Sequence, residues 1–211
     1  MKTNYDIIII GGGLLGCATA YQLAKRNAGD ILLVDGNEIA SQASARAACL
    51  LTRARTKPAP MELVQETYDC ISEIENLLGE SLDLQMCGSV TIASSEASLK
   101  ELEALDEAVN RFGIPNERIS RERSKELLPW ISEEAIDTAL YMPTDAFIDS
   151  ALLCSGYAKA AKQLGVCLRP NCKVKEIIVD GDTVTGIRLY NGEGITAPIV
   201  VNAAGAWANL L

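Results

Sequence analysis

The hydrophobic and polar positions of the chain begin with an apolar run that stops at three glycines. Ile7–Ile10 is continuous and β-branched, which is typical of a strand that is covered on both faces in a parallel sheet. Residues 14–27 then repeat their apolar positions at helical spacing, and residues 27–29 end that helix. Ile31–Val34 predicts a second buried strand, which stops at Asp35. The start of the chain is therefore expected to form a strand–helix–strand unit.

The middle of the chain combines amphipathic repeats with one stretch of small residues. Helices are predicted over Pro58–Leu78, residues 96–112, residues 120–128 and a segment that Asp149 or Ser150 caps and that reaches Gly165. Residues 84–94 are strand-like, and residues 141–149 are turn-rich. Residues 36–51 are first small and polar, then small and apolar, and permit two interpretations. They either let the backbone approach a large flat ligand, or form a loop that leads into a short buried helix.

The C-terminal part changes to a strand-like pattern. Strands are predicted over residues 173–179, 183–190 and 195–201, with hairpin turns at Asp180-Gly181 and Asn191-Gly192. These three strands are expected to form a meander. Its last apolar run, residues 199–201, then leads into small residues and the start of a helix.

The glycines after the first strand fit the pattern G-x-G-x-x-G. Gly11 permits a tight turn, Gly13 lets a pyrophosphate approach the backbone, and Gly16 lets the helix pack closely on the strand. The helix N-terminus offers N–H groups and a positive dipole end to phosphates. Asp35 follows Gly16 by about 20 residues, where a carboxylate accepts hydrogen bonds from a ribose diol and repels a 2′-phosphate. FAD or NAD is thus favoured over NADP, and a purely structural turn is the alternative.

Net charge and composition limit the classes of partner. The chain has 211 residues, 48% of them hydrophobic, and a net charge of −9, which repels nucleic acid and anionic membranes. The apolar run at residues 7–20 is too short and too rich in glycine for a transmembrane segment. We expect a cytoplasmic protein with no nucleic-acid partner and no membrane span.

Histidine and cysteine usage narrows the chemistry further. The chain has no histidine, which excludes a histidine base or metal ligand within it. Seven cysteines without any C-x-x-C spacing make a disulfide framework or a zinc site unexpected, and no metal is predicted. The cysteines are interpreted as small buried residues in a reducing compartment.

The ordered set of motifs resembles the FAD-dependent oxidoreductases of the D-amino-acid oxidase type, a group that includes glycine oxidase, sarcosine oxidase and amino-acid dehydrogenases. The matching segments are IIIIGGGLLG, VDG, SARAACLL, YMPTDAFID, NCKVKEI and VVNAAGAWA. The first and last favour FAD over NAD. The resemblance implies an α/β fold: a Rossmann-like FAD-binding domain with a parallel sheet plus a β-meander, and the beginning of a mixed α+β substrate domain. Residues 1–80 and 146–211 are assigned to the FAD-binding domain, and residues 81–145 to the first part of the substrate or cap domain.

The resemblance also implies a set of cofactor-binding residues: Gly11, Gly13, Leu14, Leu15, Gly16, Asp35, Gly36, Ser44, Ala45, Arg46, Ala47, Val174, Ala203, Gly205 and Trp207. The glycine turn would hold the pyrophosphate and Asp35 the adenosine ribose. Residues 44–47 would lie along the pyrophosphate and the flavin, with a surface or phosphate role favoured for Arg46 over catalysis. Val174 would face the adenine through its backbone, and the last three residues would close over the nucleotide half. No catalytic residue is assigned.

The activity implied is oxidation of the C–N bond of an amino acid or amine, with hydride transfer to flavin N5. Members of the family continue well beyond the position of Leu211, so we expect a missing segment or a second chain to complete the substrate site. Open strand edges would then cause poor solubility or self-association. The alternatives are a non-catalytic dinucleotide-binding fragment or subunit, and an NAD-dependent dehydrogenase, which the meander and the last motif disfavour.

Cys49 departs from the family pattern, because relatives often carry a glycine at this position. Its side chain would either crowd the flavin or simply pack in the protein. A buried structural thiol is favoured over a cysteinyl-flavin link. The absence of histidine excludes a histidyl link.

Overall fold

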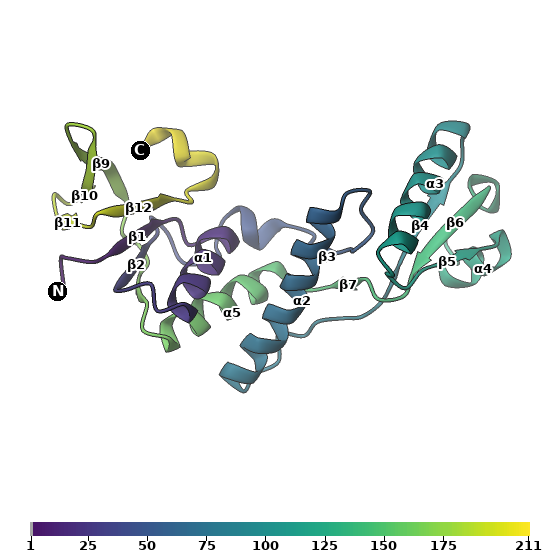
Figure 1. The fold of residues 1–211 in the computed structure, drawn as a ribbon, viewed down its shortest axis with the longest axis horizontal. Helices are drawn as coiled ribbons and strands as arrows, with labels where there is room; N and C mark the ends of the chain where they lie inside the picture. Colours follow the sequence, from purple (N-terminus) through teal and green to yellow (C-terminus); the bar gives the residue numbers. More distant parts are fainter. Residues whose placement is uncertain (1) are drawn as a thin grey trace. The chain divides into compact units, whose positions relative to one another are not determined.

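A computed structural model describes residues 2–211 of the chain, which divide into two compact units (Figure 1). Unit 1 comprises Met1–Ala48, Glu73–Leu82 and Asp149–Leu211, and unit 2 comprises Cys49–Ser72 and Asp83–Ile148. Helix α2, Pro58–Leu78, contributes residues to both. No helix within residues 2–211 is both long enough and apolar enough to cross a membrane.

Unit 1 is built on a four-stranded parallel sheet with the order β12-β1-β2-β8. Its strands are β1 (Ile7–Ile10), β2 (Ile31–Val34), β8 (Cys167–Arg169) and β12 (Ile199–Asn202). Every residue of β1 and β2 is buried, as the continuous apolar runs predict. In the register of the sheet, Ile9 lies between Leu33 and Val201. The predicted Rossmann-like parallel sheet is confirmed.

Two helices pack together against this sheet (Figure 1). They are α1 (Leu14–Lys25) and α5 (Ser150–Gln163), and the rings of Tyr21 and Tyr157 meet edge to face at 5.7 Å between centroids. The carboxylate of Asp149 caps α5 by accepting hydrogen bonds from the N–H groups of Ala151 and Leu152 at 2.7 and 3.1 Å. The packing of α5 on α1 holds α1, the helix that follows the glycine turn, beside the strands.

A three-stranded antiparallel meander belongs to the same unit. It consists of β9 (Val174–Asp180), β10 (Thr183–Leu189) and β11 (Gly194–Thr196). Its buried side chains, among them Ile187 and Ile195, share a core with alternate residues of the parallel strands, among them Ile8 and Leu32. The predicted meander is confirmed in its first two strands.

The prediction of one strand over residues 195–201 is wrong. The structure has two strands there, because β11 ends at Thr196 and β12 begins at Ile199. Pro198 lies between them and has no N–H group to donate to a ladder. The chain thus leaves the meander and enters the parallel sheet beside β1. The helix expected after β12 is the 3₁₀ segment η3, Gly205–Leu210.

An ion pair joins β8 to the turn that follows β10. Nη1 and Nη2 of Arg169 each donate a hydrogen bond to the carboxylate of Glu193 at 2.8 Å. The side chains of Arg169 and Glu193 are only 14% and 26% exposed. The hydrogen bonds from Arg169 hold the pKa of Glu193 below its usual range and raise the pKa of Arg169. The pair connects the edge of the parallel sheet to the meander.

Glu193→Ala is expected to lower the free energy of unfolding by about 1–2 kcal/mol at neutral pH, because it leaves Arg169 largely buried without its partner. Since the folded pKa of Glu193 is depressed, its contribution is present above the unfolded value, about 4.3, and is lost as the pH falls through the folded value. Urea unfolding at neutral and acidic pH measures both effects. The control is Glu176→Ala, which removes an exposed pair with Arg188 and should cost at most about 0.5 kcal/mol. Equal losses in the two variants would contradict the prediction.

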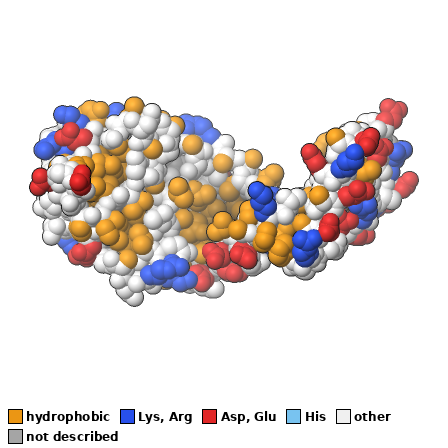
Figure 2. Space-filling view, turned by 45° about the horizontal axis from the view of Figure 1, so that its top comes forward, with side chains coloured by type: hydrophobic (Ala, Val, Ile, Leu, Met, Phe, Trp, Pro, Cys, Tyr) orange, Lys and Arg blue, Asp and Glu red, His pale blue; other side chains and the backbone are white. Residues whose placement is uncertain are grey.

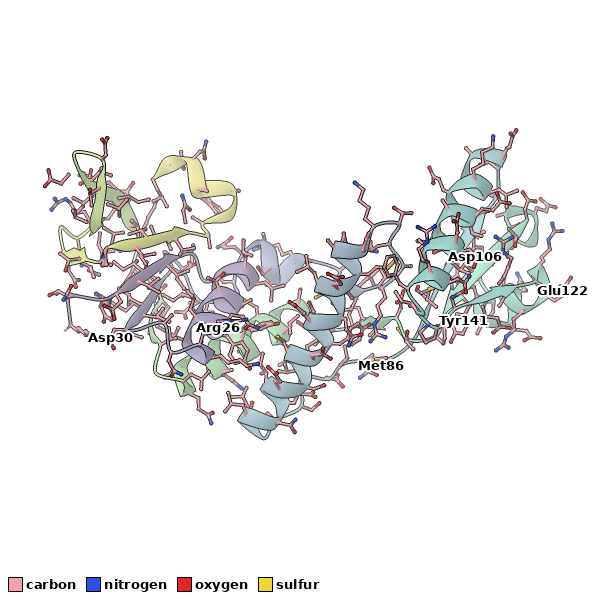
Figure 3. All side chains as sticks on the ribbon, in the orientation of Figure 1. Arg26, Asp30, Met86, Asp106, Glu122 and Tyr141 are labelled. Carbon is pink, nitrogen blue, oxygen red and sulfur yellow. The ribbon has the colours of Figure 1, made fainter. Side chains whose placement is uncertain are left out.

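Unit 2 contains an antiparallel sheet with the order β4-β6-β5 and a strand pair β3–β7. Its elements are β3 (Leu50–Leu51), β4 (Ser89–Ala93), α3 (Glu96–Arg111), β5 (Glu117–Ile119), α4 (Arg121–Leu127), η2 (Glu133–Ala135), β6 (Thr138–Met142) and β7 (Ala146–Phe147). Leu102 and Val109 of α3 share a core with Leu140 and Met142 of β6. Asp106 of α3 also pairs with Arg118 of β5 at 3.2 Å (Figure 3).

The predicted helices of this region are confirmed, and the strands are confirmed only in part. The strand-like residues 84–94 contain β4, but β5 and β6 were not predicted, and residues 141–149 were interpreted as turn-rich. Tyr141 instead belongs to β6, and Ala146 begins β7, so only residues 143–145 make the turn. β5 and β7 are only three and two residues long, which is too short for alternation to be recognised, and the burial of the five-residue β6 does not alternate.

Candidate functional site

A cavity of about 750 Å³ lies in unit 1 at the carboxyl ends of the parallel strands. It begins where β1 leads into Gly11, β2 into Asp35 and β12 into Ala203, because parallel strands end at the same edge of the sheet. The lining comprises residues 10–15, 34–38, 41–44, 173–174, 190, 202–208 and 210–211. Three segments far apart in the sequence thus meet at one edge.

The glycines of the turn have different structural roles. Gly11 has φ +116°, and a Cβ there would lie 2.3 Å from the carbonyl oxygen of Ala203. A Cβ on Gly16 would lie 1.9 Å from the carbonyl oxygen of Gly11. A Cβ on Gly13 meets only the hydroxyl of Ser44, at 3.0 Å. The fold therefore requires Gly11 and Gly16, whereas the absence of a side chain at Gly13 leaves backbone open to the cavity.

The N-terminus of α1 faces this cavity, and no carboxylate of α1 itself caps it. Gly13 is the N-cap and supplies no side-chain hydrogen bond, and the first turn contains no acidic residue. The N–H group of Leu14 donates to the hydroxyl of Ser44 at 2.8 Å, which brings residues 41–44 over the helix end. The positive end of the helix dipole is therefore available to an anionic group.

Asp35 is held at the end of β2 by two backbone donors. The N–H of Gly12 donates to Oδ2 at 2.6 Å, and the N–H of Asn37 donates to Oδ1 at 2.7 Å. Among the described residues Asp35 forms no ion pair. Each oxygen keeps a further lone pair for a hydroxyl donor, which is the chemistry that a ribose diol needs.

Two buried thiols donate hydrogen bonds to the backbone of the glycine turn. Cys17 of α1 and Cys154 of α5 are fully buried, and their Sγ atoms lie 3.5 and 3.7 Å from the carbonyl oxygen of Gly12 as donors. The hydrogen bond with Cys154, followed by burial, raises the pKa of Cys17. These two residues agree with the interpretation of the cysteines as buried. That interpretation is wrong for Cys87, which is exposed.

The structure brings most of the predicted cofactor residues to the cavity wall. Those that line it are Gly11, Gly13, Leu14, Leu15, Asp35, Gly36, Ser44, Val174, Ala203, Gly205 and Trp207. Gly16 lies behind the turn against Gly11, and Ala45, Arg46 and Ala47 are not part of the lining. The guanidinium of Arg46 instead contacts the Gln42 side chain at 3.4 Å. The cofactor roles of all these residues stay predictions.

Sequence reasoning did not include some residues of the lining. Asn37, Glu38, Lys173 and Tyr190 are the main ones, and the last two lie opposite each other, just before β9 and just after β10. The register of β9 against β10 would have been needed to find them. Residues 36–51 do not form the alternative short buried helix, because η1, Ala43–Arg46, is a 3₁₀ turn without a buried residue.

Cys49 has a backbone conformation that favours glycine. Its φ is +49°, in the left-handed region that glycine adopts more readily than other residues. The carbonyl oxygen of Cys49 accepts a hydrogen bond from the N–H of Ile148 at 3.3 Å, within unit 2. Cys49, the residue that departs from the expected pattern, thus lies at a position whose left-handed backbone favours glycine.

The face of the molecule shown in Figure 2 carries interspersed acidic and basic side chains, without an extended basic surface. Among residues 2–211, no group of three or more cysteine, aspartate or glutamate side chains is placed to hold a metal ion.

The glycine turn, the free helix N-terminus and the acid after β2 define a dinucleotide-binding α/β protein. Comparison with known proteins identifies the family: the chain matches the FAD dependent oxidoreductases (DAO) over residues 6–211 and belongs to that family. Members of this family depend on FAD.

Two curated relatives cover the chain almost completely. The 4-methylaminobutanoate oxidase (formaldehyde-forming) of Paenarthrobacter nicotinovorans is 30% identical over 207 residues, 98% of this chain and 25% of that protein. The mitochondrial sarcosine dehydrogenase of Homo sapiens is 31% identical over 215 residues, 99% of this chain and 23% of that protein. The chain thus spans about a quarter of the length of these relatives.

Solved structures support the fold over the whole chain. The L-proline dehydrogenase from P. horikoshii has a TM-score of 0.90 at 25% identity, covering 100% of this chain and 55% of that one. The glycine oxidase from Geobacillus kaustophilus has a TM-score of 0.85 at 26% identity, covering 100% and 58%. The predicted α/β class and the predicted family are both confirmed.

Proposed function

We propose that unit 1 binds FAD in its cavity as part of an FAD-dependent oxidoreductase that oxidises the C–N bond of an amino acid or amine. The single observation that carries the proposal is the opening at Gly13, where bare backbone faces the same cavity as the start of α1, whose N-cap supplies no side-chain hydrogen bond. A pyrophosphate fits this arrangement because it needs close backbone approach and N–H donors.

The described residues fit the remaining parts of FAD. The carboxylate of Asp35 is proposed to accept hydrogen bonds from the adenosine ribose, and Val174 to face the adenine through its backbone. Ala203, Gly205 and Trp207 supply a wall of mostly small residues on the other side. Ser44 is proposed to orient the start of α1 and lie along the pyrophosphate, while Arg46 takes a surface role.

Bound flavin would supply the redox chemistry, and we propose that it would be the acceptor, at N5, of a hydride from the carbon beside the substrate nitrogen. The residues of this chain are proposed to bind and orient the cofactor, and none is assigned as a base. The names of the relatives support an amine or amino-acid substrate, since they include sarcosine, proline and glycine. Both oxidases and dehydrogenases are among them, so the electron acceptor is left open.

The two units are proposed to have separate tasks. Unit 1 is proposed to serve as the FAD-binding domain and unit 2 as the beginning of the substrate domain; unit 2 includes residues 49–72, which the sequence prediction assigned to the FAD-binding domain. The need for a second chain or a further segment to complete the substrate site stays a prediction, as does the cytoplasmic location.

Retention of flavin tests the proposal directly. After incubation with FAD and desalting, the chain is expected to keep the visible absorption of oxidised flavin. Asp35→Asn keeps the acceptor for Gly12 but removes the charge, and should weaken FAD binding about tenfold. The matched control is Asp30→Asn at the amino end of β2 (Figure 3), which should bind FAD like the parent. A folded parent that retains no flavin would refute the proposal.

A non-catalytic role is the second candidate function. One relative, 29% identical over 208 residues, is named a pyruvate dehydrogenase phosphatase regulatory subunit. The two functions differ in what happens when sarcosine, glycine or proline is added without oxygen to the FAD-loaded protein. Bleaching of the flavin indicates an enzyme, whereas an unchanged oxidised spectrum with all three shows only that this chain does not oxidise them without the segment or second chain predicted to complete the substrate site.

A further inference from the structure

Lys173 and Tyr190 form a pair at one end of the unit 1 cavity that the family assignment does not explain. Lys173 immediately precedes β9, and Tyr190 immediately follows β10. The N–H of Tyr190 donates to the carbonyl oxygen of Lys173 at 3.0 Å, which holds the two residues opposite each other. Both line the cavity, with Lys173 preceding Val174 in the chain and Tyr190 following Leu189, the residue that pairs with Val174.

The two side chains are associated with each other while remaining accessible. The Lys173 ammonium lies 4.9 Å from the centroid of the Tyr190 ring, as a cation–π contact. Tyr190 is 63% exposed, so burial in the core does not account for an aromatic ring at this position. Lys173 is also exposed, and among the described residues it forms no ion pair.

Position along the cavity indicates which part of a dinucleotide the pair would meet. Gly36 follows Asp35 directly, and a Cβ on Gly36 would lie 3.4 Å from Cγ of Lys173. The cavity wall therefore runs from the start of α1 to Asp35, then to Gly36, and then to Lys173 and Tyr190. A dinucleotide presents pyrophosphate, ribose and purine in the same order.

We infer that Lys173 and Tyr190 form a clip for the purine of the bound dinucleotide, an inference that rests on the proposed function. The Tyr190 ring supplies an apolar surface against the base, where aromatic contact is favourable. The Lys173 ammonium keeps the ring in place and donates a hydrogen bond to a purine nitrogen or a ribose oxygen, both of which are acceptors. The clip would make the site selective for adenosine-containing ligands over flavin mononucleotide.

Calorimetric titration of the 211-residue chain with FAD and with ADP, which shares the purine, ribose and pyrophosphate, tests the clip. Tyr190→Ala is expected to raise both dissociation constants about tenfold, and Lys173→Ala about threefold. Tyr190→Phe keeps the ring and should stay within about twofold of the parent. Lys175→Ala is the matched control, because Lys175 is exposed on β9 but does not line the cavity.

The outcomes separate the clip from the proposed function. If the parent binds FAD and ADP, and Tyr190→Ala binds both equally well, the clip is wrong and the proposed function stands. If the folded parent binds neither ligand, the proposed function fails and the clip with it. Circular dichroism of each variant without ligand verifies folding, and the exposed Tyr190→Phe and Lys173→Ala variants provide the comparison should Tyr190→Ala not fold.

Discussion

Gly11→Ala is expected to lower the free energy of unfolding by about 3–5 kcal/mol, from positive-φ strain plus a backbone clash. Gly11 has φ +116°, and the added Cβ would lie 2.3 Å from the carbonyl oxygen of Ala203. That atom belongs to the backbone, so no side-chain rotation relieves the contact. Ala203 is itself held there, because its N–H donates to the carbonyl oxygen of Ile10 at 2.8 Å.

The loss is a large share of the total stability of an ordinary domain, about 5–15 kcal/mol. Urea unfolding measures it as a shift of the midpoint. Gly181→Ala is the matched control, since Gly181 has φ +59° in a hairpin turn and no atom lies within 4 Å of an added Cβ. That variant should lose only about 1 kcal/mol, the cost of the backbone conformation alone. Equal losses at the two sites would show that contact with Ala203 contributes nothing.

Gly13→Val is expected to leave folding nearly intact and to weaken FAD binding about 100-fold. The backbone at Gly13 is extended, with φ −80°, so valine adopts it without strain. The nearest atom to an added Cβ is the hydroxyl of Ser44 at 3.0 Å, the end of a small side chain. The methyl groups would occupy the space through which the proposed pyrophosphate reaches the backbone.

Two measurements are needed for this variant, the stability without ligand and the dissociation constant for FAD. The free energy of unfolding should change by no more than about 1 kcal/mol. Gly194→Val introduces the same side chain in β11, where a Cβ meets no atom within 4 Å, and should leave FAD binding unchanged. Binding by Gly13→Val that matches the parent would mean that no phosphate lies against this backbone.

The cofactor cradle was predictable from the sequence to the extent that its parts are local. Ile7–Ile10, the glycine turn and Asp35 follow one another within a short stretch, and each has a recognisable pattern. Arg46 shows the limit of this reasoning. Residues 44–47 were expected to lie along the pyrophosphate and the flavin, yet only Ser44 of them reaches the cavity wall, where its hydroxyl accepts a hydrogen bond from the N–H of Leu14.

By itself, the sequence determined the strand–helix–strand unit, the positions that require glycine or an acid, and the family. The first two follow from hydrophobic period and from spacing within a few turns of chain, and the family follows from the resemblance of the ordered motifs. Only the tertiary structure decided that β8 and β12 complete the parallel sheet, that Pro198 divides the last strand, and that Lys173 and Tyr190 meet beside Gly36. Each of these depends on strand pairing between distant residues. The pattern of a three- or four-residue strand does not encode its partner or its register, which are set by the packing of the whole unit.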